Sequence, residues 1–524
     1  MSKKLNRAEY RDKVLGCWLG KNIGGTAGAP FEWQRRVNNI SFYPQTNLRG
    51  DAMPNDDLDI QLLWLCAMEE KGVDVTSHRL AEYWTTYVTP HWSEYGTGKT
   101  NMRQGLPPPL SGTFQNDFKN SCGSYIRSEI WACVAPGAPA KAAQLAYEDA
   151  ILDHGNGEGV FAEMFMAALE SAAFVLDDLR ACVNVGLSFV PEDCGVARAV
   201  KTTLECFDKK MTWLEMRDEV LRLHRGRLPC WAHVSDEDRA KGFDTGALGY
   251  DVPSNIAFTL GGLLWGGADF GQVQCICVNL GEDTDCTAAT AGSVWGILHG
   301  AKNIPQKWID PIGRGIKTVT LNLGELGYFG NQLPQNVDEL TDRTLAVAEK
   351  IQRANWFEVM LSDDATDCRG MKWEELKSRD NGRGIWGGFN GPRYDFDLFS
   401  AHVDYGVDGP LAFPDEPKRI RVTLKNTYKT QLNLSLHWYA PEGWSISPNN
   451  GFFHLLMGMQ TDNVPPALDF SITIPEPQMT RSTLRAVLEI TAEGRPTVAL
   501  VPLVLLNGKF YKKPPADCES AMPF

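Results

Sequence analysis

Two short acidic clusters carry the chemistry that this sequence offers most clearly. Pro54-Asn55-Asp56-Asp57 and Gly281-Glu282-Asp283-Thr284-Asp285 each stand at the start of an apolar run that is typical of a buried helix. Carboxylates at a helix start are stabilised by the helix dipole and by free backbone N–H groups, so helix capping alone would explain either cluster. If both clusters faced one point, they would instead form a cage of hard oxygen ligands for Mg²⁺ or Mn²⁺. The residues by themselves leave both interpretations open.

The elements that would position these clusters are predicted to be helices. Apolar residues recur at the helical period from residue 8 to about residue 350, and few segments there alternate as strands do. Clusters of proline and glycine separate the periodic runs. The clearest runs are 80–87, 140–153, 160–176, 213–224 and 255–264. The expected fold class is therefore mainly α, an all-α helical bundle followed by a small C-terminal β-sandwich.

The composition changes near residue 360. A glycine-rich connector, 381–392, is followed by runs of β-strand character that proline and glycine turns separate. These runs are 420–424, 432–439, 470–474, 484–490 and 498–506. We therefore expect a catalytic helical domain over 1–360, a connector over 361–394 and an immunoglobulin-like β-sandwich over 395–524. A role in stability or in homo-oligomer formation is expected for the sandwich, although two short stretches are similar to modules appended to carbohydrate-active enzymes.

Composition and charge exclude several classes of partner. Lys plus Arg number 51 against 65 Asp plus Glu, and no basic stripe with interleaved aromatic residues occurs, so nucleic acid is not expected as a partner. The N-terminal residues lack the apolar stretch of a secretory signal, and no apolar span of ~20 residues predicts a membrane helix. We expect a cytoplasmic protein without a membrane partner. The 13 cysteines, many of them in apolar runs, fit a reducing compartment.

Five segments, taken in order, resemble the ADP-ribosylglycohydrolase family, which includes the dinitrogenase reductase-activating glycohydrolases. A glycine-rich helix and turn that ends in Glu32 is similar to the first family signature, and Asn55-Asp56-Asp57 is similar to the Thr-Asp-Asp signature. Residues 281–288 are similar to the signature Gly-Gly-Asp-Thr-Asp-Thr-Asn-Ala, and residues 122–127 and 246–250 to two intervening family segments. The resemblance covers roughly residues 8 to 350 and implies the all-α fold of the family.

The resemblance implies a site that holds one or two Mg²⁺ or Mn²⁺ ions and a glycosyl substrate. The implied metal ligands are Asn55, Asp56, Asp57, Asp283 and Asp285. The implied catalytic residues are Glu32, Asp56 and Asp285. Glu32 closes a glycine-rich turn, where it would position substrate or act as acid and base. The expected substrate-binding residues are Glu32, Ile126, Arg127, His154 and Tyr250. His154 lies in a polar loop between two apolar helices, and a helix-capping role is its alternative.

Three positions depart from the family pattern. Asn55 replaces a threonine, and its amide oxygen can still ligate a hard cation. Cys286 replaces the ligating threonine of the third signature; its thiol suits Mg²⁺ poorly, and the hydroxyl of Thr287 is turned about 100° away along a helix. One metal position is therefore expected to be weakened or filled by water. Glu282 replaces a glycine and either binds water or points outward. Asp59, which follows the first cluster, is expected on the outer face of its helix.

The function expected from the resemblance is metal-dependent hydrolysis of the anomeric bond of a ribofuranosyl group, in an ADP-ribosyl or related substrate. Cations in such a site orient the sugar, lower the pKa of bound water and support an oxocarbenium-like transition state. Two alternatives stay open: a carbohydrate furanosidase on the same fold, and a non-catalytic, crystallin-like family member. The sequence has no nucleophile-elbow, P-loop or His-Glu-x-x-His motif that would favour another chemistry.

Overall fold

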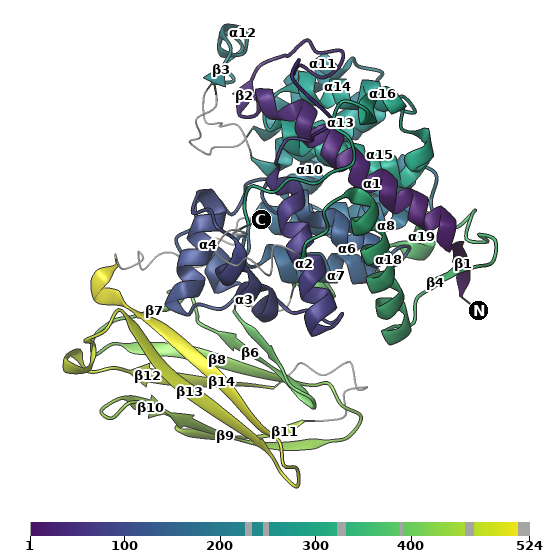
Figure 1. Ribbon diagram of the computed structural model, residues 1–524. Helices are drawn as coiled ribbons and strands as arrows, with labels where there is room; N and C mark the ends of the chain where they lie inside the picture. Colours follow the sequence, from purple (N-terminus) through teal and green to yellow (C-terminus); the bar gives the residue numbers. More distant parts are fainter. Residues whose placement is uncertain are drawn as a thin grey trace. The chain divides into compact units, whose positions relative to one another are not determined.

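The computed structural model describes residues 2–225, 233–244, 251–321, 332–387, 391–455 and 466–511. The chain divides into two compact units (Figure 1). The first unit joins Met1–Lys99 with Gln115–Gly387, and the second joins Thr100–Phe114 with Gly388–Phe524. The first unit is mainly helical and the second consists mainly of strands. The expected fold class, a helical region followed by a strand-rich C-terminal region, is confirmed.

The helical unit is a bundle in which each predicted periodic run overlaps a helix, although the runs 140–153 and 160–176 extend three residues beyond the ends of their helices. Its longer helices include α1 (Arg7–Gly28), α2 (Asp56–Lys71), α3 (Ser77–Tyr87), α6 (Ser128–Val134), α7 (Pro139–Ala150), α8 (Glu158–Ala173), α9 (Leu179–Leu187), α10 (Gly195–Asp208), α11 (Trp213–His224), α13 (Val252–Gly266), α14 (Phe270–Leu280), α15 (Thr284–His299) and α18 (Val337–Ala354). The helix α4 (Ser93–Gln104) continues into the second unit. Short parallel pairs join β1 (Lys3–Asn6) to β4 (Val359–Ser362) and β2 (Gln34–Arg35) to β3 (His233–Val234). Among the helices that the structure describes, none has both the length and the apolar character needed to cross a bilayer.

Helix α1 packs closely against α15, because glycines let the two backbones approach each other. A Cβ atom built on Gly20 would lie 2.1 Å from the carbonyl oxygen of Gly292, and one on Gly24 would lie 2.2 Å from that of Ala288. Residue numbers rise along α1 as they fall along α15, so the helices are antiparallel and the end of α1 meets the start of α15. The complete set of facing pairs is Gly16–Gly296, Gly20–Gly292, Gly24–Ala288 and Gly28–Thr284.

This packing corrects one expectation about the glycine-rich segment before Glu32. The glycines from Gly24 to Gly28 were expected in a turn that approaches a ligand, but they are buried residues of α1. Glycine in a helix interior costs about 0.5–1 kcal/mol relative to alanine. The segment stays helical because the missing side chains allow the backbone of α15 to pack against it. The polypeptide leaves the helical path only after Gly28, in a short 3₁₀ turn over Ala29–Phe31.

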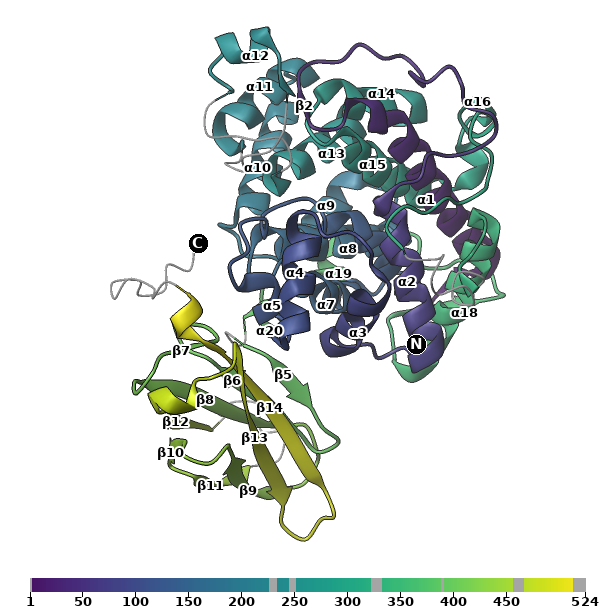
Figure 2. The same cartoon turned by 60° about the vertical axis from the view of Figure 1, so that its left-hand side comes forward.

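The second unit is a β-sandwich of two five-stranded sheets that share one core. One sheet has the order β10-β12-β8-β6-β5 and the other the order β11-β9-β13-β14-β7. Figure 2 shows the two sheets lying face to face. The strands are β5 (Arg393–Asp395), β6 (Phe399–Asp404), β7 (Leu411–Ala412), β8 (Pro417–Asn426), β9 (Leu432–Tyr439), β10 (Ser445–Ser447), β11 (Asn450–Leu455), β12 (Ala467–Thr473), β13 (Thr483–Ala492) and β14 (Val498–Asn507).

An earlier segment of the chain completes the core of the sandwich. Along β13 the burial alternates, so that Leu488 and Ile490 point into the same core as Phe470 of the opposite sheet. Leu106 and Leu110 belong to this core as well, although they precede the first strand of the sandwich by more than 280 residues. Leu110 begins the short helix α5 (Leu110–Thr113). The strand-rich unit is therefore assembled from two separate stretches of sequence.

Candidate active site

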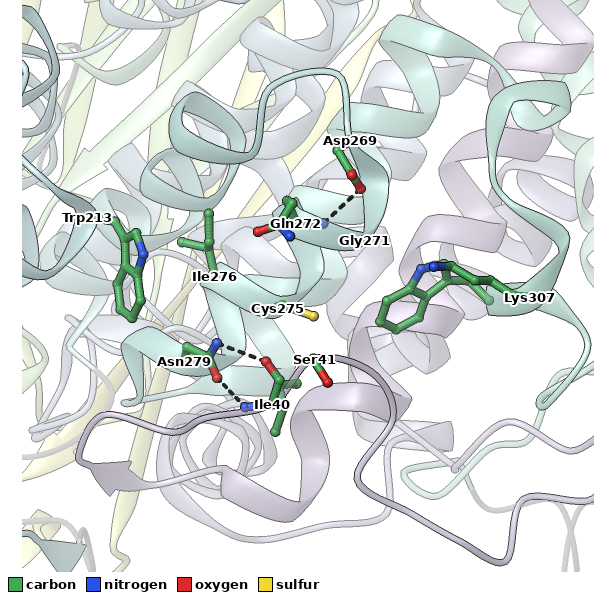
Figure 3. Close-up of a pocket in the computed structure, with 11 residues that line it drawn as sticks. Ile40, Ser41, Trp213, Asp269, Gly271, Gln272, Cys275, Ile276, Asn279 and Lys307 are labelled. Carbon is green, nitrogen blue, oxygen red and sulfur yellow. Dashed lines mark hydrogen bonds between the residues drawn. The ribbon is translucent and has the colours of Figure 1, made fainter.

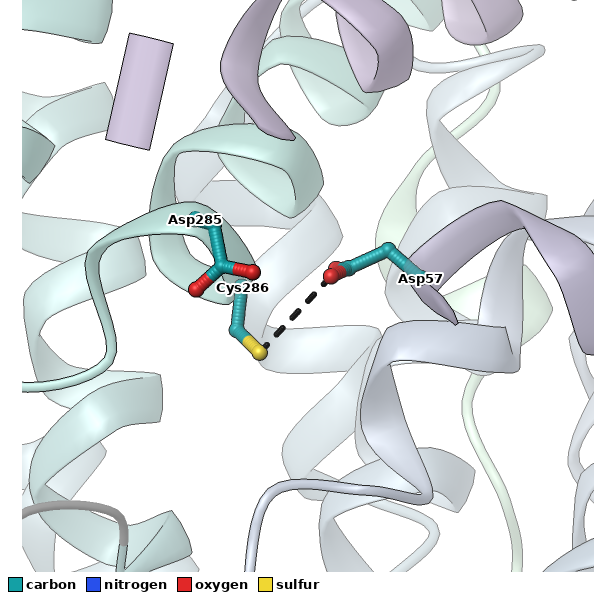
Figure 4. A group of neighbouring side chains, drawn as sticks. All are labelled: Asp57, Asp285 and Cys286. Carbon is teal, nitrogen blue, oxygen red and sulfur yellow. Dashed lines mark hydrogen bonds between the residues drawn. The ribbon is translucent and has the colours of Figure 1, made fainter. Parts of the chain in front are cut away.

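The two acidic clusters and Glu32 come together where the end of α1 and the starts of α2 and α15 meet. Ligand atoms of Glu32, Asp283 and Asp285 all lie within 4.8 Å of one another. Those of Asp57, Asp285 and Cys286 also lie within 4.8 Å of one another (Figure 4). Asp285 belongs to both groups and joins them. The antiparallel pairing of α1 with α15 explains the meeting, because it brings the residues after Gly28 to the residues that begin α15.

The aspartate carboxylates of the two clusters are not used as helix caps. At the start of α2 the capping residue is Asn55, whose Oδ1 accepts a hydrogen bond from the backbone N–H of Asp57 at 2.8 Å. Asp283 stands at the capping position of α15, but its side chain makes no capping hydrogen bond. The Oδ1 atoms of Asp283 and Asp285 are buried and accept no hydrogen bond within the described part of the chain. Buried charged oxygens without partners are costly, so the cluster is suited to a cation.

The first acidic cluster is held from several sides. The hydroxyl of Tyr95 donates a hydrogen bond to Oδ2 of Asp56 at 3.2 Å. The Nδ2 of Asn55 donates to Oδ2 of Asp285 at 3.5 Å, which links the two clusters directly. The amide group of Asn55 therefore lies between Asp57 and Asp285: its Oδ1 accepts the capping hydrogen bond from Asp57, and its Nδ2 donates to Asp285.

A buried lysine from α1 supplies the counter-charge for this cluster. The ammonium of Lys21, 1% exposed, lies 3.2 Å from Oδ1 of Asp57 and 2.7 Å from Oε1 of Glu129. Burial opposes the charge on Lys21, yet Glu129 and Asp57 raise its pKa overall, so the lysine stays charged. Sequence reasoning missed this residue; the signal that could have found it is a charged side chain in the middle of a helix segment rich in glycine and apolar residues.

Close packing of like charges perturbs the acids of the site. Burial, followed by the charges of Asp283 and Asp56, raises the pKa of Glu32 to about 9. Burial and then Asp57 raise the pKa of Asp56 to about 6. Burial and the neighbouring carboxylates also raise the pKa values of Asp283 and Asp285 well above the usual range. Without a cation, the cluster therefore retains protons near neutral pH.

Two acidic neighbours of the clusters lie elsewhere than expected. Asp59 was expected on the outer face of α2, but this is wrong: it is buried and accepts hydrogen bonds from the backbone N–H groups of Val319 at 2.6 Å and Thr320 at 2.7 Å. Glu282 was expected to bind water or to point outward. It is instead fully buried and forms a bidentate ion pair with Arg35, whose Nη2 donates to Oε2 at 2.8 Å.

Arg127 and His154, which were predicted to bind substrate, lie in a separate buried network. The Nη2 of Arg127 lies 2.9 Å from Oδ1 of Asp153 and 3.0 Å from Oδ1 of Asp149, and neither Arg127 nor His154 is exposed. The ring of His154 pairs with Oδ1 of Asp153 at 2.8 Å. Ile126 is also buried, and its carbonyl accepts a hydrogen bond from Gln61. Tyr250 lies outside the described residues. A contact of these four residues with substrate stays a prediction.

A cavity of about 230 Å³ lies along α14, the helix that leads into the second acidic cluster (Figure 3). Trp213 and Trp308 are among the residues that line it, and Asp269, Cys275 and Asn279 contribute from α14 and its start. Both amide atoms of Asn279 are used by the backbone of Ile40, at 2.8 and 3.1 Å. No residue of the two acidic groups lines this cavity, so it is separate from the candidate active site.

Comparison with known proteins gives two matches. The profile of the family described as ADP-ribosylglycohydrolase matches residues 6–353. The ADP-ribosylarginine hydrolase Tri1 of Serratia proteamaculans is 39% identical over 49 residues, a stretch that spans 9% of this chain and 13% of that relative. The family match includes α1, α2 and α15, and with them every residue of the two acidic groups.

Proposed function

The chain belongs to the ADP-ribosylglycohydrolase family, and from this premise we propose that it hydrolyses the anomeric bond of an ADP-ribosyl group with the aid of a divalent cation. The observation that supports this proposal most is the convergence of the two acidic clusters in two ligand groups that share Asp285, while the side chain of Asp283 makes no capping hydrogen bond. If these carboxylates served only to cap α2 and α15, their oxygens would accept hydrogen bonds from the backbone N–H groups at the helix starts.

The donor set fits Mg²⁺ or Mn²⁺. Asp57, Asp283 and Asp285 would hold one or two such ions, and Asp56 would stand beside them, oriented by Tyr95. Unpartnered carboxylate oxygens on Asp283 and Asp285 provide the hard ligands that these cations prefer. When bound, the cation would supply positive charge that orients ribose hydroxyls and lowers the pKa of a bound water.

The protein's own residues would bind the sugar and move the proton. Glu32 is only partly buried, so a substrate can reach it, and burial together with the neighbouring carboxylates raises the pKa of its carboxyl group to about 9 in the cation-free protein. Glu32 would donate a proton to the leaving group as the anomeric bond breaks. A water molecule would add its oxygen to the anomeric carbon and return one proton to Glu32. The curated relative is named for ADP-ribosylarginine, and a guanidino nitrogen is accordingly the leaving group that we propose.

Product analysis with the full chain tests this function. Incubation with an ADP-ribosylated arginine peptide and Mg²⁺ should release free ADP-ribose, and Asp285→Asn should abolish the release. Asp269→Asn is the matched control, because Asp269 caps α14 through Gln272 and lies outside the acidic groups. Cleavage of aryl furanosides without release of ADP-ribose would favour a carbohydrate furanosidase. A protein that binds the cation but cleaves neither substrate would be a non-catalytic member of the family.

A further inference from the structure

One of the two acidic groups contains sulfur. Asp57, Asp285 and Cys286 come from the starts of α2 and α15, and Figure 4 shows their side chains pointing toward one another. Cys286 is 7% exposed, Asp57 1% and Asp285 4%. The thiol of Cys286 donates to Oδ2 of Asp57 at 3.8 Å. A second observation in this group also indicates a cation site: the buried Oδ1 of Asp285 has no hydrogen-bond partner in the described part of the chain.

Two neighbouring side-chain oxygens make hydrogen bonds within their own helix starts. The hydroxyl of Thr287 donates to the carbonyl of Thr284 at 3.3 Å, within its own helix turn. The amide oxygen of Asn55 accepts the capping hydrogen bond from Asp57 at 2.8 Å. The sulfur of Cys286, in contrast, lies within 4.8 Å of carboxylate oxygens of both Asp57 and Asp285.

The distance between the sulfur of Cys286 and Oδ2 of Asp57 is close to the distance between two ligands of a small tetrahedral ion. Zn²⁺ binds cysteine sulfur at about 2.3 Å and carboxylate oxygen at about 2.0–2.2 Å, which places sulfur and oxygen about 3.5 Å apart in tetrahedral geometry. The observed distance from Sγ of Cys286 to Oδ2 of Asp57 is 3.8 Å. Lys21 lies 3.2 Å from the other oxygen, Oδ1, and is anchored by Glu129, so Oδ2 stays directed toward the thiol.

We propose that Asp57, Asp285 and Cys286 form a binding position for a thiophilic divalent cation of the Zn²⁺ type, distinct in preference from an all-oxygen position at Asp283 and Asp285. Thiolate ligands select Zn²⁺ and similar ions, whereas Mg²⁺ requires oxygen ligands. A bound ion would displace the thiol proton, because a coordinating thiol is deprotonated. This inference relies on the proposed function only in taking the acidic clusters as a cation site.

Cobalt spectroscopy tests the sulfur ligand without any measurement of activity. The full-length protein, freed of metal by a chelator, is titrated with Co²⁺ as a coloured substitute for Zn²⁺. Wild-type protein should develop a sulfur-to-cobalt charge-transfer band in the near ultraviolet, and added Zn²⁺ should remove it. Cys286→Ser should lose the band and bind Zn²⁺ about 10-fold more weakly or worse, while its affinity for Mn²⁺ is unchanged or higher.

Two other thiols serve as matched controls. Cys275 on α14 lines the separate cavity, and Cys275→Ser should keep the band. Cys122 is a buried thiol that neighbours Asp283 but lies outside the three-residue group, and Cys122→Ser should also keep the band. Circular dichroism of each metal-free variant checks its fold, and Cys286→Thr replaces Cys286→Ser if the latter does not fold.

The outcomes separate this inference from the proposed function. Co²⁺ binding by wild-type protein without the band, or a band that survives in Cys286→Ser, would overturn the sulfur ligand. Loss of the band in Cys122→Ser alone would overturn it as well. Release of ADP-ribose with Mg²⁺ in the absence of any band would support the proposed function and contradict the sulfur ligand. A band without release of ADP-ribose from any peptide would support the sulfur ligand and contradict the proposed function.

Discussion

Replacing Asp285 by asparagine should stabilise the cation-free protein, which a helix-capping role would not predict. Ligand atoms of Glu32, Asp283 and Asp285 lie within 4.8 Å of one another. Two unit charges at that distance repel by about 3.5 kcal/mol at an effective dielectric constant of 20. The wild-type cluster escapes part of this repulsion by retaining protons, as the raised pKa values show. Allowing for water around the partly exposed Glu32, we expect Asp285→Asn to raise the free energy of unfolding by about 2–3 kcal/mol at pH 8.

The stabilisation of the cation-free protein by Asp285→Asn should be larger at pH 8 than at pH 5. The pKa of Asp56 is raised to about 6 and that of Glu32 to about 9, from ordinary values of 3.8 and 4.5. A carboxyl group with a higher pKa in the folded state binds more protons when folded, so stability falls as the pH rises from the unfolded to the folded value. Cation-free wild-type protein should therefore be more stable at pH 5 than at pH 8, and Asp285→Asn should reduce this difference.

Urea denaturation of the full chain at both pH values, with and without Mn²⁺, measures these effects. At a concentration 100-fold above its Kd, the cation should stabilise wild-type protein by about 2.7 kcal/mol and should lose most of this effect in Asp285→Asn. Asp269→Asn is the control, since asparagine caps a helix about as well as aspartate and stability should stay unchanged. The reasoning is refuted if Asp285→Asn destabilises the cation-free protein and still responds to Mn²⁺ as wild type does.

Three further substitutions test how the site is supported. Gly20→Ala should destabilise the protein by about 1–3 kcal/mol or more, because its Cβ would lie 2.1 Å from the carbonyl oxygen of Gly292; an unchanged Tm by circular dichroism would contradict the close pairing of α1 with α15. Lys21→Met should cost about 3–5 kcal/mol in urea denaturation, since it leaves Asp57 buried without its counter-charge; a variant as stable as wild type would show that the carboxylate is neutral in the folded protein. Arg127→Lys should lower Tm, because a lysine ammonium cannot keep the contacts that the buried guanidinium makes with both Asp149 and Asp153; a raised KM for an ADP-ribosylated peptide at constant Tm would instead support the predicted contact with substrate.

Local patterns in the sequence predicted the elements well where one face of the element is apolar. The run 213–224 coincides with α11 and the run 432–439 with β9, because helical and alternating periodicities are local properties. The glycine-rich end of α1 was wrongly expected in a turn. Glycine favours turns in isolation, and only the opposing backbone of α15 makes it the required residue in this helix.

The candidate site was predictable to the extent that its residues lie in compact motifs. The motifs predicted that Asp57 and Asp285 lie close together, but they did not predict which residues contact Asp59 and Glu282. Asp59 is buried by residues near 320, and Glu282 by Arg35, and neither partner is near its carboxylate in sequence. The same limit applies to the β-sandwich, whose core includes residues from before the first strand. Such long-range contacts depend on how helices and loops pack, which periodicity does not encode.

Anomalous diffraction from crystals of the full chain soaked in Mn²⁺ tests most directly whether the acidic cluster is a cation site. The structure predicts an anomalous peak within about 2.0–2.6 Å of carboxylate oxygens of Asp285 and of Asp57 or Asp283. Crystals of Asp285→Asn should lack this peak under the same conditions. Wild-type crystals with ordered Asp57, Asp283 and Asp285 side chains, and manganese only at other places on the molecule, would contradict the assignment of these carboxylates as metal ligands.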